Sequence, residues 1–545
     1  MQAFEPLLSA RRLTFSYDED EKPIFQNVSF QLRKGERALL LGPSGCGKSS
    51  LALCLNGLYP EACDAVQTGT VSLNGTPLSN LAGPAAASIG VVFQDPDQQF
   101  CMLTVEDEIA FGLENLQYTK EDMDTIIDDV LEKLEITHLK TRTIASLSGG
   151  SKQKVALACI IAMDPELIIL DEPTAQLDPY SVREFVRLIK ELQAKRNFGL
   201  LVIEHQLDHW VPWMDRTIVL DETGQIVMDG ETDAVFETKL EELTRLGIPI
   251  PRVIPLQKYV NIPFTLCKES LFHKPVPALP CPRAAALSAE DALSVHGLSC
   301  KRGTDVIFQD VSFSVKKGSI TAIAGPNGTG KSTLLSAAAK LIRPVSGDIK
   351  IDGRPIDSYS EKELRRLMGY VFQNPEHQFV TDSVINELLF GFEDGNAAKE
   401  KALQLLTRFG LRRHASQHPF SLSQGQKRRL SVATMLMHNV KVLLLDEPTF
   451  GQDAKTAREC MLMLREIQKE GTAVLMVTHD MELVSDYADT ILVLCGTKLV
   501  YRGTPDSLFT DHIGTAERAH LALPLRYEWM KQDRRRRNER AAGSC

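Results

Sequence analysis

The chain has 545 residues, of which 43% are hydrophobic and 24% are charged, and its formal net charge is −10. A chain of this length and hydrophobic content can bury more than one core, whereas its negative charge argues against a general nucleic-acid binder. No apolar run approaches the roughly 20 residues of a membrane helix, and residues 1–15 lack the apolar segment of a secretory signal. The eleven cysteines form no C-x-x-C pair, so we expect them to be reduced in the cytosol.

A phosphate-binding loop is the first motif along the chain. Residues 42–49 spell G-x-x-x-x-G-K-S, after an apolar strand predicted at 37–41 and before a helix predicted from Ser49 to Leu55. In this motif backbone N–H groups surround phosphate oxygens, the lysine reaches the β and γ phosphates, and the serine hydroxyl ligates magnesium. The pattern therefore predicts a nucleotide site.

Two further apolar strands lead into polar residues. The strand at 167–170 precedes Asp171 and Glu172, and the strand at 200–203 precedes His205. Strands this apolar are typical of a mostly parallel sheet that is buried on both faces. Asp171 is predicted to hold magnesium through water, Glu172 to polarise the attacking water, and His205 to sense the γ-phosphate. The alternatives are acids that cap a strand and a structural histidine.

Proline-rich sequence follows, and we place a linker at 266–290, between a first domain at 1–265 and a second at 291–533. A basic tail at 534–545 contains Arg534 to Arg537. Such a run is either solvated and disordered or attracted to an anionic membrane surface.

The second half repeats the first. Residues 325–332 are again G-x-x-x-x-G-K-S, the two loop lysines are 283 positions apart, and residues 25–30 return as 308–313. The strand at 442–445 leads into Asp446 and Glu447, and the strand at 474–477 precedes His479. A repeat of this length indicates two nucleotide-binding domains in one polypeptide.

A third repeated motif is Leu-Ser-Gly-Gly-Ser-Lys-Gln at 147–153, which returns as Leu-Ser-Gln-Gly-Gln-Lys-Arg at 422–428. Serine and glycine at a helix N-terminus present a hydroxyl and free N–H groups to an anion. These motifs, in this order, resemble those of the ATP-binding-cassette (ABC) superfamily. The resemblance implies an α/β fold of two tandem ABC ATPase (P-loop NTPase) domains. Each would have a mostly parallel core sheet, an antiparallel β subdomain and a helical subdomain.

In that family the signature of one cassette completes the ATP site of the other, so the resemblance implies two composite sites for ATP and Mg²⁺. The implied catalytic residues are Glu172, His205, Glu447 and His479. The implied nucleotide-binding residues of the first half are Tyr17, Gly42, Ser44, Gly45, Gly47, Lys48, Ser49, Ser50, Gln94, Ser148, Gly149 and Gly150. Those of the second half are Gly325, Asn327, Gly328, Gly330, Lys331, Ser332, Thr333, Gln373, Ser423 and Gly425. The implied magnesium ligands are Ser49, Gln94, Asp171, Ser332, Gln373 and Asp446.

The stretches at 92–100 and 371–379 are similar to those of the ATPases of energy-coupling-factor (ECF) transporters, which import vitamins and transition-metal ions into prokaryotic cells. Residues 230–260 and 503–529 resemble their C-terminal extension. The implied partners are an integral-membrane coupling protein and a substrate-binding membrane component. No nucleic-acid partner is implied, and because both cassettes lie in one chain, an obligate homodimer is not required. The implied location is peripheral, on the cytoplasmic face of the membrane, and the implied cargo is a vitamin, a precursor such as a thiamine-related compound, or a metal ion.

Three departures predict unequal sites: Gln424 replaces a signature glycine, Gln206 replaces the aspartate seen at Asp480, and Cys300 stands where the first half has Tyr17. An aromatic ring there would stack on adenine. We also expect a groove for a basic helix of the membrane partner after each glutamine. The groove residues would be exposed acids at 106–108, 376 and 387 with apolar anchors at Phe100, Phe111, Phe379 and Phe390.

Two other interpretations remain open. One is a fused ATPase of a sugar importer, which shares the size but not the stretches after the two glutamines. The other is a soluble twin-cassette translation or ribosome-associated factor, which typically carries a long charged helical arm where this chain has prolines.

Overall fold

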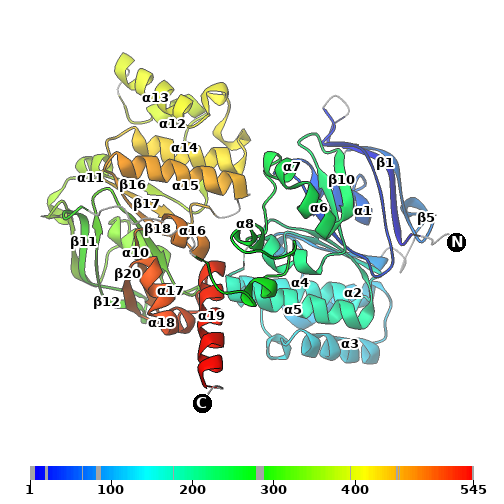
Figure 1. Ribbon diagram of the computed structural model, residues 1–545. Helices are drawn as coiled ribbons and strands as arrows, with labels where there is room; N and C mark the ends of the chain where they lie inside the picture. The colour runs from blue at the N-terminus through cyan, green and yellow to red at the C-terminus, as the bar shows by residue number, and fades with distance from the viewer. Residues whose placement is uncertain are drawn as a thin grey trace. The chain divides into compact units, whose positions relative to one another are not determined.

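The computed structural model describes residues 6–18, 22–63, 65–81, 87–175, 177–277, 288–392, 395–449, 452 and 454–542 (Figure 1). The chain divides into two compact units, Met1–Leu271 and Phe272–Cys545. Within the described residues, no helix combines the length and apolar character needed to cross a membrane.

The first unit is built on a six-stranded sheet in the order β10-β9-β3-β8-β7-β6. The strands are β3 (Arg37–Leu41), β6 (Ile89–Val92), β7 (Leu167–Asp171), β8 (Gly199–Ile203), β9 (Arg216–Leu220) and β10 (Ile226–Glu231). All neighbours pair in parallel except β9 and β10. Leu39 and Leu41 belong to one hydrophobic cluster and Ala38 and Leu40 to another, so both faces of the sheet are buried. This explains why its strands are apolar throughout.

A second, antiparallel sheet has the order β2-β1-β4-β5. Its strands are β1 (Leu8–Ser16), β2 (Phe25–Leu32), β4 (Val66–Leu73) and β5 (Thr76–Pro77). The helices of this unit are α1 (Lys48–Asn56), α2 (Val105–Asn115), α3 (Lys120–Lys133), α4 (Gly149–Ala162), α5 (Pro179–Arg196), α6 (Thr232–Thr238), α7 (Leu240–Arg245), α8 (Val253–Gln257) and α9 (Glu269–Phe272). Helices α2, α3 and α4 contact one another and form the helical subdomain.

The second unit repeats this plan, with a core sheet in the order β16-β17-β18-β13-β19-β20 and an antiparallel sheet β12-β11-β14-β15. The strands are β11 (Asp291–Arg302), β12 (Asp305–Lys316), β13 (Ile320–Ala324), β14 (Ser346–Ile351), β15 (Arg354–Pro355), β16 (Met368–Val371), β17 (Val442–Asp446), β18 (Ala473–Val477), β19 (Thr490–Cys495) and β20 (Lys498–Gly503). The helices are α10 (Lys331–Ala338), α11 (Glu361–Leu367), α12 (Val384–Leu389), α13 (Asn396–Arg408), α14 (Gln424–Leu436), α15 (Ala454–Lys469), α16 (Met481–Tyr487), α17 (Pro505–Thr510), α18 (Ile513–Arg518) and α19 (Leu525–Ala542). The predicted fold class is confirmed.

The boundary between the units falls inside the predicted linker at 266–290, and part of that segment is packed rather than extended. Leu266 and Leu271 are buried in the first unit. On the second unit, the Lys274 carbonyl accepts a hydrogen bond from Trp529 Nε1 at 3.0 Å, and Val276 N–H donates to Asp533. Residues 278–287 of the predicted linker lie outside the described residues.

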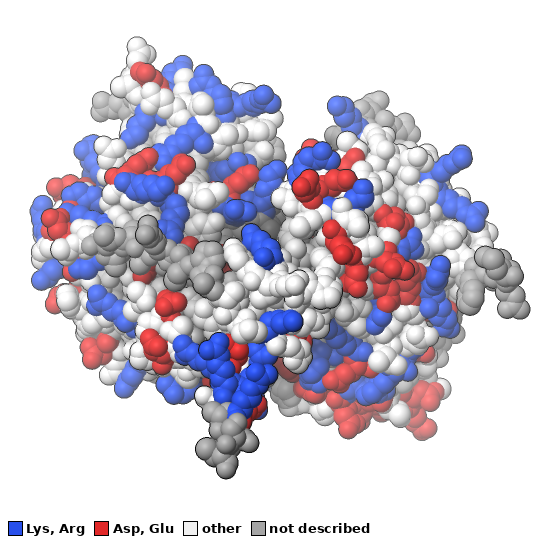
Figure 2. All heavy atoms as spheres, viewed as in Figure 1, with Lys and Arg blue, Asp and Glu red and all other residues white. Residues whose placement is uncertain are grey.

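The expectation that the basic run is disordered is wrong, because helix α19 continues through Arg534 to Ala542. Trp529 is fully buried and anchors the helix. Farther along, the Asp533 carboxylate pairs with Arg536 and Arg537, one helical turn away, and so offsets part of the crowded positive charge. Figure 2 shows Lys and Arg side chains gathered over this helix.

Candidate active sites

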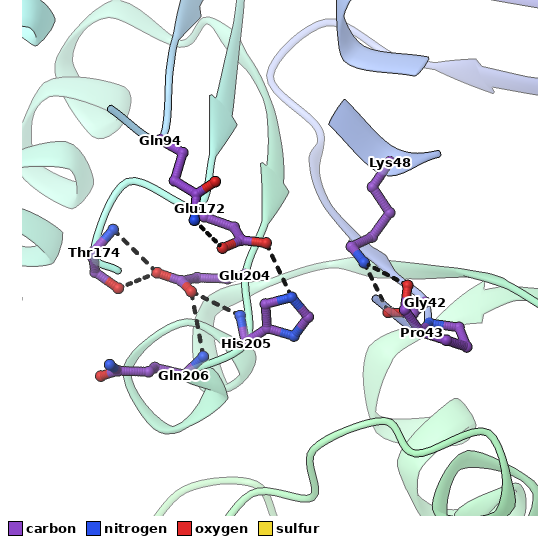
Figure 3. Close-up of polar contacts among 9 residues, drawn as sticks. All are labelled: Gly42, Pro43, Lys48, Gln94, Glu172, Thr174, Glu204, His205 and Gln206. Carbon is purple, nitrogen blue, oxygen red and sulfur yellow. Dashed lines mark hydrogen bonds and ion pairs between the residues drawn. The ribbon is translucent and has the colours of Figure 1, made fainter. Parts of the chain in front are cut away.

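In both units the phosphate-binding loop connects a central strand to a helix. The first loop lies between β3 and α1, and the second between β13 and α10. Gly47 has φ +91°, and a Cβ there would meet Ile24 at 2.7 Å, so this position needs glycine. Lys48 Nζ donates to the carbonyls of Gly42 and Pro43, both at 2.9 Å (Figure 3). The lysine side chain therefore lies along its own loop, and its ammonium group is placed to bind a phosphate group held there.

The second loop has the same geometry. Gly330 has φ +84°, and Lys331 Nζ donates to the carbonyls of Gly325 and Pro326, both at 2.9 Å. The predicted loop residues Ser44, Gly45, Asn327 and Gly328 lie in the turns that precede α1 and α10, and Ser49, Ser50, Ser332 and Thr333 lie in the first turns of those helices.

Each acid pair stands at the carboxyl end of a core strand, β7 or β17. The neighbouring strand, β8 or β18, separates it from the strand that leads into the phosphate-binding loop. Asp171 and Asp446 end strands β7 and β17, and each is followed by a glutamate with positive φ, +45° for Glu172 and +46° for Glu447. Non-glycine residues seldom adopt this conformation, and strained backbone of this kind gathers at functional sites. The same strained glutamate in two separate units argues for a shared function.

The aspartates fit the predicted magnesium ion. Asp171 is buried, and its Oδ1 atom has no hydrogen-bond partner among the described residues. Burial raises the pKa of Asp171 to about 6, and a hydrogen bond with Ser49 opposes the shift. In the second unit Asp446 accepts a hydrogen bond from Ser332 Oγ at 3.0 Å, and burial raises its pKa too. A buried carboxylate beside a serine hydroxyl is a suitable partial ligand set for a hard divalent cation.

Each glutamate contacts the histidine that follows the neighbouring strand. Glu172 Oε1 lies 3.0 Å from His205 Nε2, and Glu447 Oε2 lies 2.9 Å from His479 Nδ1. Burial favours a higher pKa for Glu172, but the hydrogen bond and charge of His205 outweigh it, and the pKa is lowered. Burial favours a lower pKa for His479, but the hydrogen bond with Glu447 outweighs it, and the pKa is raised. The two pairs thus use opposite ring nitrogens.

The segments that carry the two predicted glutamines are held by different residues in the two units. Gln94 Nε2 donates to Glu172 Oε2 at 2.8 Å, on the side of the carboxylate opposite His205 (Figure 3). The backbone of this glutamine segment is held by Gln153 of α4, whose Nε2 atom contacts the carbonyl of Gln94 at 3.3 Å. In the second unit the buried Arg428 of α14 replaces Gln153. Its guanidinium donates to the carbonyls of Phe372 and Gln373, and also to that of Glu447 at 3.3 Å.

The signature serines are helix N-caps. Ser148 is exposed, caps α4 and accepts a hydrogen bond from Ser151 N–H, and Ser423 is exposed and caps α14 in a capping box with Gln426. Gly149, Gly150 and Gly425 lie in the first turns of these helices. The helix ends therefore present free N–H groups to solvent, as expected for an anion contact. Their pairing with the loop of the other unit stays a prediction.

Tyr17 lies beside the first loop, where its hydroxyl is 2.9 Å from Ser50 Oγ and its ring is 44% exposed. The assignment of Cys300 to the equivalent position is wrong. Phe15 pairs with Phe25 across the β1–β2 hairpin, and Cys300 pairs with Phe308 across the β11–β12 hairpin.

The reason for this error is the length of the hairpins. Ten positions separate Phe15 from Phe25 and only eight separate Cys300 from Phe308, so an alignment without a gap moves the strand by two residues. Cys300 is the buried counterpart of Phe15. Arg302, which is exposed, is the counterpart of Tyr17.

Two acids of the expected docking groove are also corrected. Glu108 and Glu387 are each only 6% exposed. The Glu108 carboxylate accepts hydrogen bonds from the N–H groups of Cys101 and Met102, and Glu387 accepts them from Val380 and Thr381. These acids fold the loop after each glutamine segment back onto a helix, and a basic partner cannot reach them. Phe379 is buried as well, whereas Phe390 is 64% exposed.

Comparison with known proteins agrees with this geometry. The model of the ABC transporter family matches residues 25–175 and 308–450. A Bacillus subtilis (strain 168) protein, YkoD, whose name describes HMP/thiamine import and ATP binding, is 62% identical over 532 residues, which are 97% of each chain. A Methanosarcina acetivorans relative, named as an ABC transporter ATP-binding protein, is 35% identical over 96% of this chain and 91% of its own length.

Among solved structures, cbiO1 of Clostridium perfringens, described as part of the ABC transporter complex cbiONQ, is 29% identical. It covers 47% of this chain and 99% of its own length, with a TM-score of 0.39. The family match and the two relatives in sequence place this chain in the ABC transporter family as an ATP-binding protein with two cassettes. It is an ATPase.

Three residues near the chemistry escaped sequence reasoning: Gln153, Arg428 and Glu204. The first two are the last residues of the two signature motifs, and this shared position could have drawn attention to them. Glu204 directly precedes the predicted histidine, but its partner, Thr174, is thirty positions away in the sequence, so no local pattern connects the two.

Proposed function

We propose that this chain hydrolyses ATP to energise an ECF-type importer of HMP, thiamine or a closely related vitamin precursor. The observation that carries the proposal is the 62% identity with the HMP/thiamine import protein, which extends over 97% of both chains and both cassettes. A relative this similar throughout supports a common cargo class, although the ATPase itself contacts no cargo. The stretches after Gln94 and Gln373 support the ECF type.

Both units would contribute to hydrolysis. Glu172 and Glu447 orient the attacking water, and His205 and His479 hold these glutamates and contact the γ-phosphate. Lys48 and Lys331 bind phosphate oxygens. Magnesium, held by Asp171 and Ser49 or by Asp446 and Ser332 together with the glutamines, would neutralise developing charge. Each signature helix, beginning at Ser148 or Ser423, would complete the opposite site.

Energy would pass to an integral-membrane coupling protein on the cytoplasmic face of the membrane. The surface after each glutamine segment retains exposed apolar side chains that suit a partner helix. Leu103 is 81% exposed and Phe111 38% exposed in the first unit, and Val380 and Phe390 are each 64% exposed in the second. The accessible acids of this region in the first unit are Asp107, which is exposed, and Glu106, which is partly exposed and lies 3.6 Å from Lys140.

Transport in vesicles tests the proposal. The chain is co-expressed with whichever integral-membrane proteins its neighbouring genes encode, and uptake of radiolabelled thiamine and HMP is measured with ATP inside or outside the vesicles. We expect ATP-dependent uptake that is lost in the Glu172→Gln/Glu447→Gln variant. ATP-dependent uptake of cobalt or a sugar in place of both vitamins, or a chain that does not bind these membrane proteins, would contradict it.

The docking surface is tested in the same complex. Leu103→Glu and Phe390→Glu should each reduce co-purification with the coupling protein, because a charge would enter an apolar contact. Val227→Glu is the matched control, since Val227 is 47% exposed on β10, away from the glutamine segment. Equal co-purification of all three variants would rule out this surface.

A further inference from the structure

A buried carboxylate connects the two catalytic loops of the first unit. Glu204 lies between β8 and His205 and is 2% exposed. Its Oε2 atom accepts hydrogen bonds from the N–H groups of His205 at 2.7 Å and Gln206 at 3.3 Å. Its Oε1 atom accepts from Thr174 N–H at 3.3 Å and from the Thr174 hydroxyl (Figure 3).

These contacts join two segments that carry catalytic groups. Thr174 stands two residues after Glu172, on the loop that leaves β7, and it is fully buried. His205 stands on the loop that leaves β8. Glu204 therefore fixes the backbone of both loops at one point, and the 3.0 Å contact between His205 and Glu172 lies next to this point. A buried carboxylate that accepts from four donors holds a rigid geometry, because loss of any one hydrogen bond leaves a buried polar group unpaired.

The second unit holds its histidine in another way. The counterpart of Glu204 is Thr478, which has no carboxylate to offer, and its hydroxyl accepts a hydrogen bond from Asp480 N–H at 3.2 Å. Asp480 caps helix α16 by accepting from the N–H groups of Glu482 and Leu483 at 2.9 and 3.1 Å. The first unit has Gln206 at this place, and a short 3₁₀ turn, Leu207–His209, begins there without a side-chain cap.

We propose that Glu204 is a positioning residue of the first ATP site. It holds His205 and Glu172 in the relative position that ATP hydrolysis requires. It fills the role that the Asp480 cap has in the second site. The inference rests on the proposed role of Glu172 in ATP hydrolysis. It also offers a reason why the first site can lack the aspartate after its histidine: the Glu204 carboxylate binds the N–H groups of both His205 and Gln206, whereas Thr478 binds only the Asp480 N–H and leaves the cap of α16 to Asp480.

The test transplants the second unit's arrangement into the first. In the full chain with Glu447→Gln, which silences the second site, Glu204→Thr removes the carboxylate, and Glu204→Thr/Gln206→Asp adds the cap. Single-turnover ATP hydrolysis and the ATP concentration at half saturation are measured for each. Because small displacements of reacting groups cost up to about a hundredfold in rate, Glu204→Thr should hydrolyse ATP about tenfold or more slowly, with half saturation changed less than about twofold.

The conservative and rescue variants separate positioning from general stability. Glu204→Gln keeps one acceptor oxygen and should be intermediate, and Glu204→Thr/Gln206→Asp should recover most of the lost rate. Thr478→Val, measured in a Glu172→Gln chain, is the matched control and should change the second-site rate little, because the Asp480 cap remains. Melting temperatures monitor folding, and Glu204→Gln serves as the test variant if Glu204→Thr does not fold.

Three results would overturn the inference: an unchanged rate in Glu204→Thr, a parallel loss of rate, affinity and melting temperature, or no recovery in the double variant. Glu172→Gln in the same background distinguishes this failure from that of the proposed function. If Glu172→Gln slows hydrolysis and Glu204→Thr does not, only the positioning role is wrong. If Glu172→Gln has no effect, the assigned catalytic role itself fails.

Discussion

The two units share a fold and the same candidate catalytic groups, but they hold these groups with different neighbours. The first unit binds its glutamate between Gln94 and His205 and ties its loops together through the carboxylate of Glu204. The second relies on cations and caps: Arg428 binds the Glu447 carbonyl, and Asp480 caps α16. A duplicated site can thus retain its chemistry while the supporting contacts diverge, so the two sites need not have equal rates.

The adenine end of each predicted site shows the same divergence. Phe15 in the first unit contacts the rings of Tyr17, Phe25 and Tyr59. The corresponding positions of the second unit hold Cys300, Arg302, Phe308 and Ile342. Phe308 is the one aromatic residue kept at these four positions, and Arg302 replaces Tyr17, although a guanidinium can also lie flat on a base.

The largest expected effect is common to both units. Glu172→Gln combined with Glu447→Gln should slow ATP hydrolysis at least about a hundredfold, since a general base contributes at least this much. ATP binding should persist, because glutamine has the same shape. Rapid-quench hydrolysis and an ATP-binding titration measure the two quantities, with the exposed Glu222→Gln as control. Parent-like hydrolysis in the double variant would remove these glutamates from the mechanism.

A smaller effect, confined to the second unit, is expected for Arg428→Gln, which introduces the first unit's residue. The buried guanidinium donates to three backbone carbonyls, and glutamine cannot reach all of them. Leaving buried carbonyls unsatisfied costs about 1–3 kcal/mol, so urea unfolding should detect a loss of this order. Second-site hydrolysis should slow while first-site hydrolysis stays constant. A variant as stable and active as the parent would refute the bracing role.

Changes at the adenine end should alter affinity by less. Tyr17→Ala should weaken ATP binding at the first site about twofold to tenfold through lost stacking. Arg302→Ala should weaken the second site about twofold to fivefold through lost cation–π contact. Cys300→Ala should leave ATP affinity unchanged, since the cysteine is buried. Fluorescent-nucleotide titrations measure these values, and a loss with Cys300→Ala but not with Arg302→Ala would contradict the register of the hairpin.

The effect that is smallest at neutral pH concerns stability under acidic conditions. Burial, reinforced by Arg183 and Lys268, lowers the pKa of His209 to about 4 from an ordinary value near 6.5. Between these values the unfolded chain binds the extra proton, so the first unit loses stability as pH falls through this window, by at most about 1.4 kcal/mol per pH unit. The second unit has Leu483 at this place, and His209→Leu should weaken the acid dependence of unfolding. Unchanged dependence would exclude His209 as its source.

Sequence motifs predicted where the candidate catalytic groups lie and which strands carry them, because the loop, the acid pair and the histidine each follow an apolar run at the carboxyl edge of a parallel sheet. They failed where contacts depend on register or distance. The equivalence of Arg302 and Tyr17 depends on a two-residue difference between hairpins, and the burial of Glu108 depends on a loop that folds back. Glu204 could not be interpreted without Thr174, which only the packing of β7 beside β8 brings near.

The central claim, two hydrolytic sites of unequal rate in one chain, is tested most directly by rapid-quench hydrolysis of magnesium–ATP in the parent, Glu172→Gln and Glu447→Gln chains. We predict two kinetic phases in the parent, of which each single variant loses a different one. A single phase in the parent that disappears with one variant and is untouched by the other would contradict the claim, because only one unit would then hydrolyse ATP.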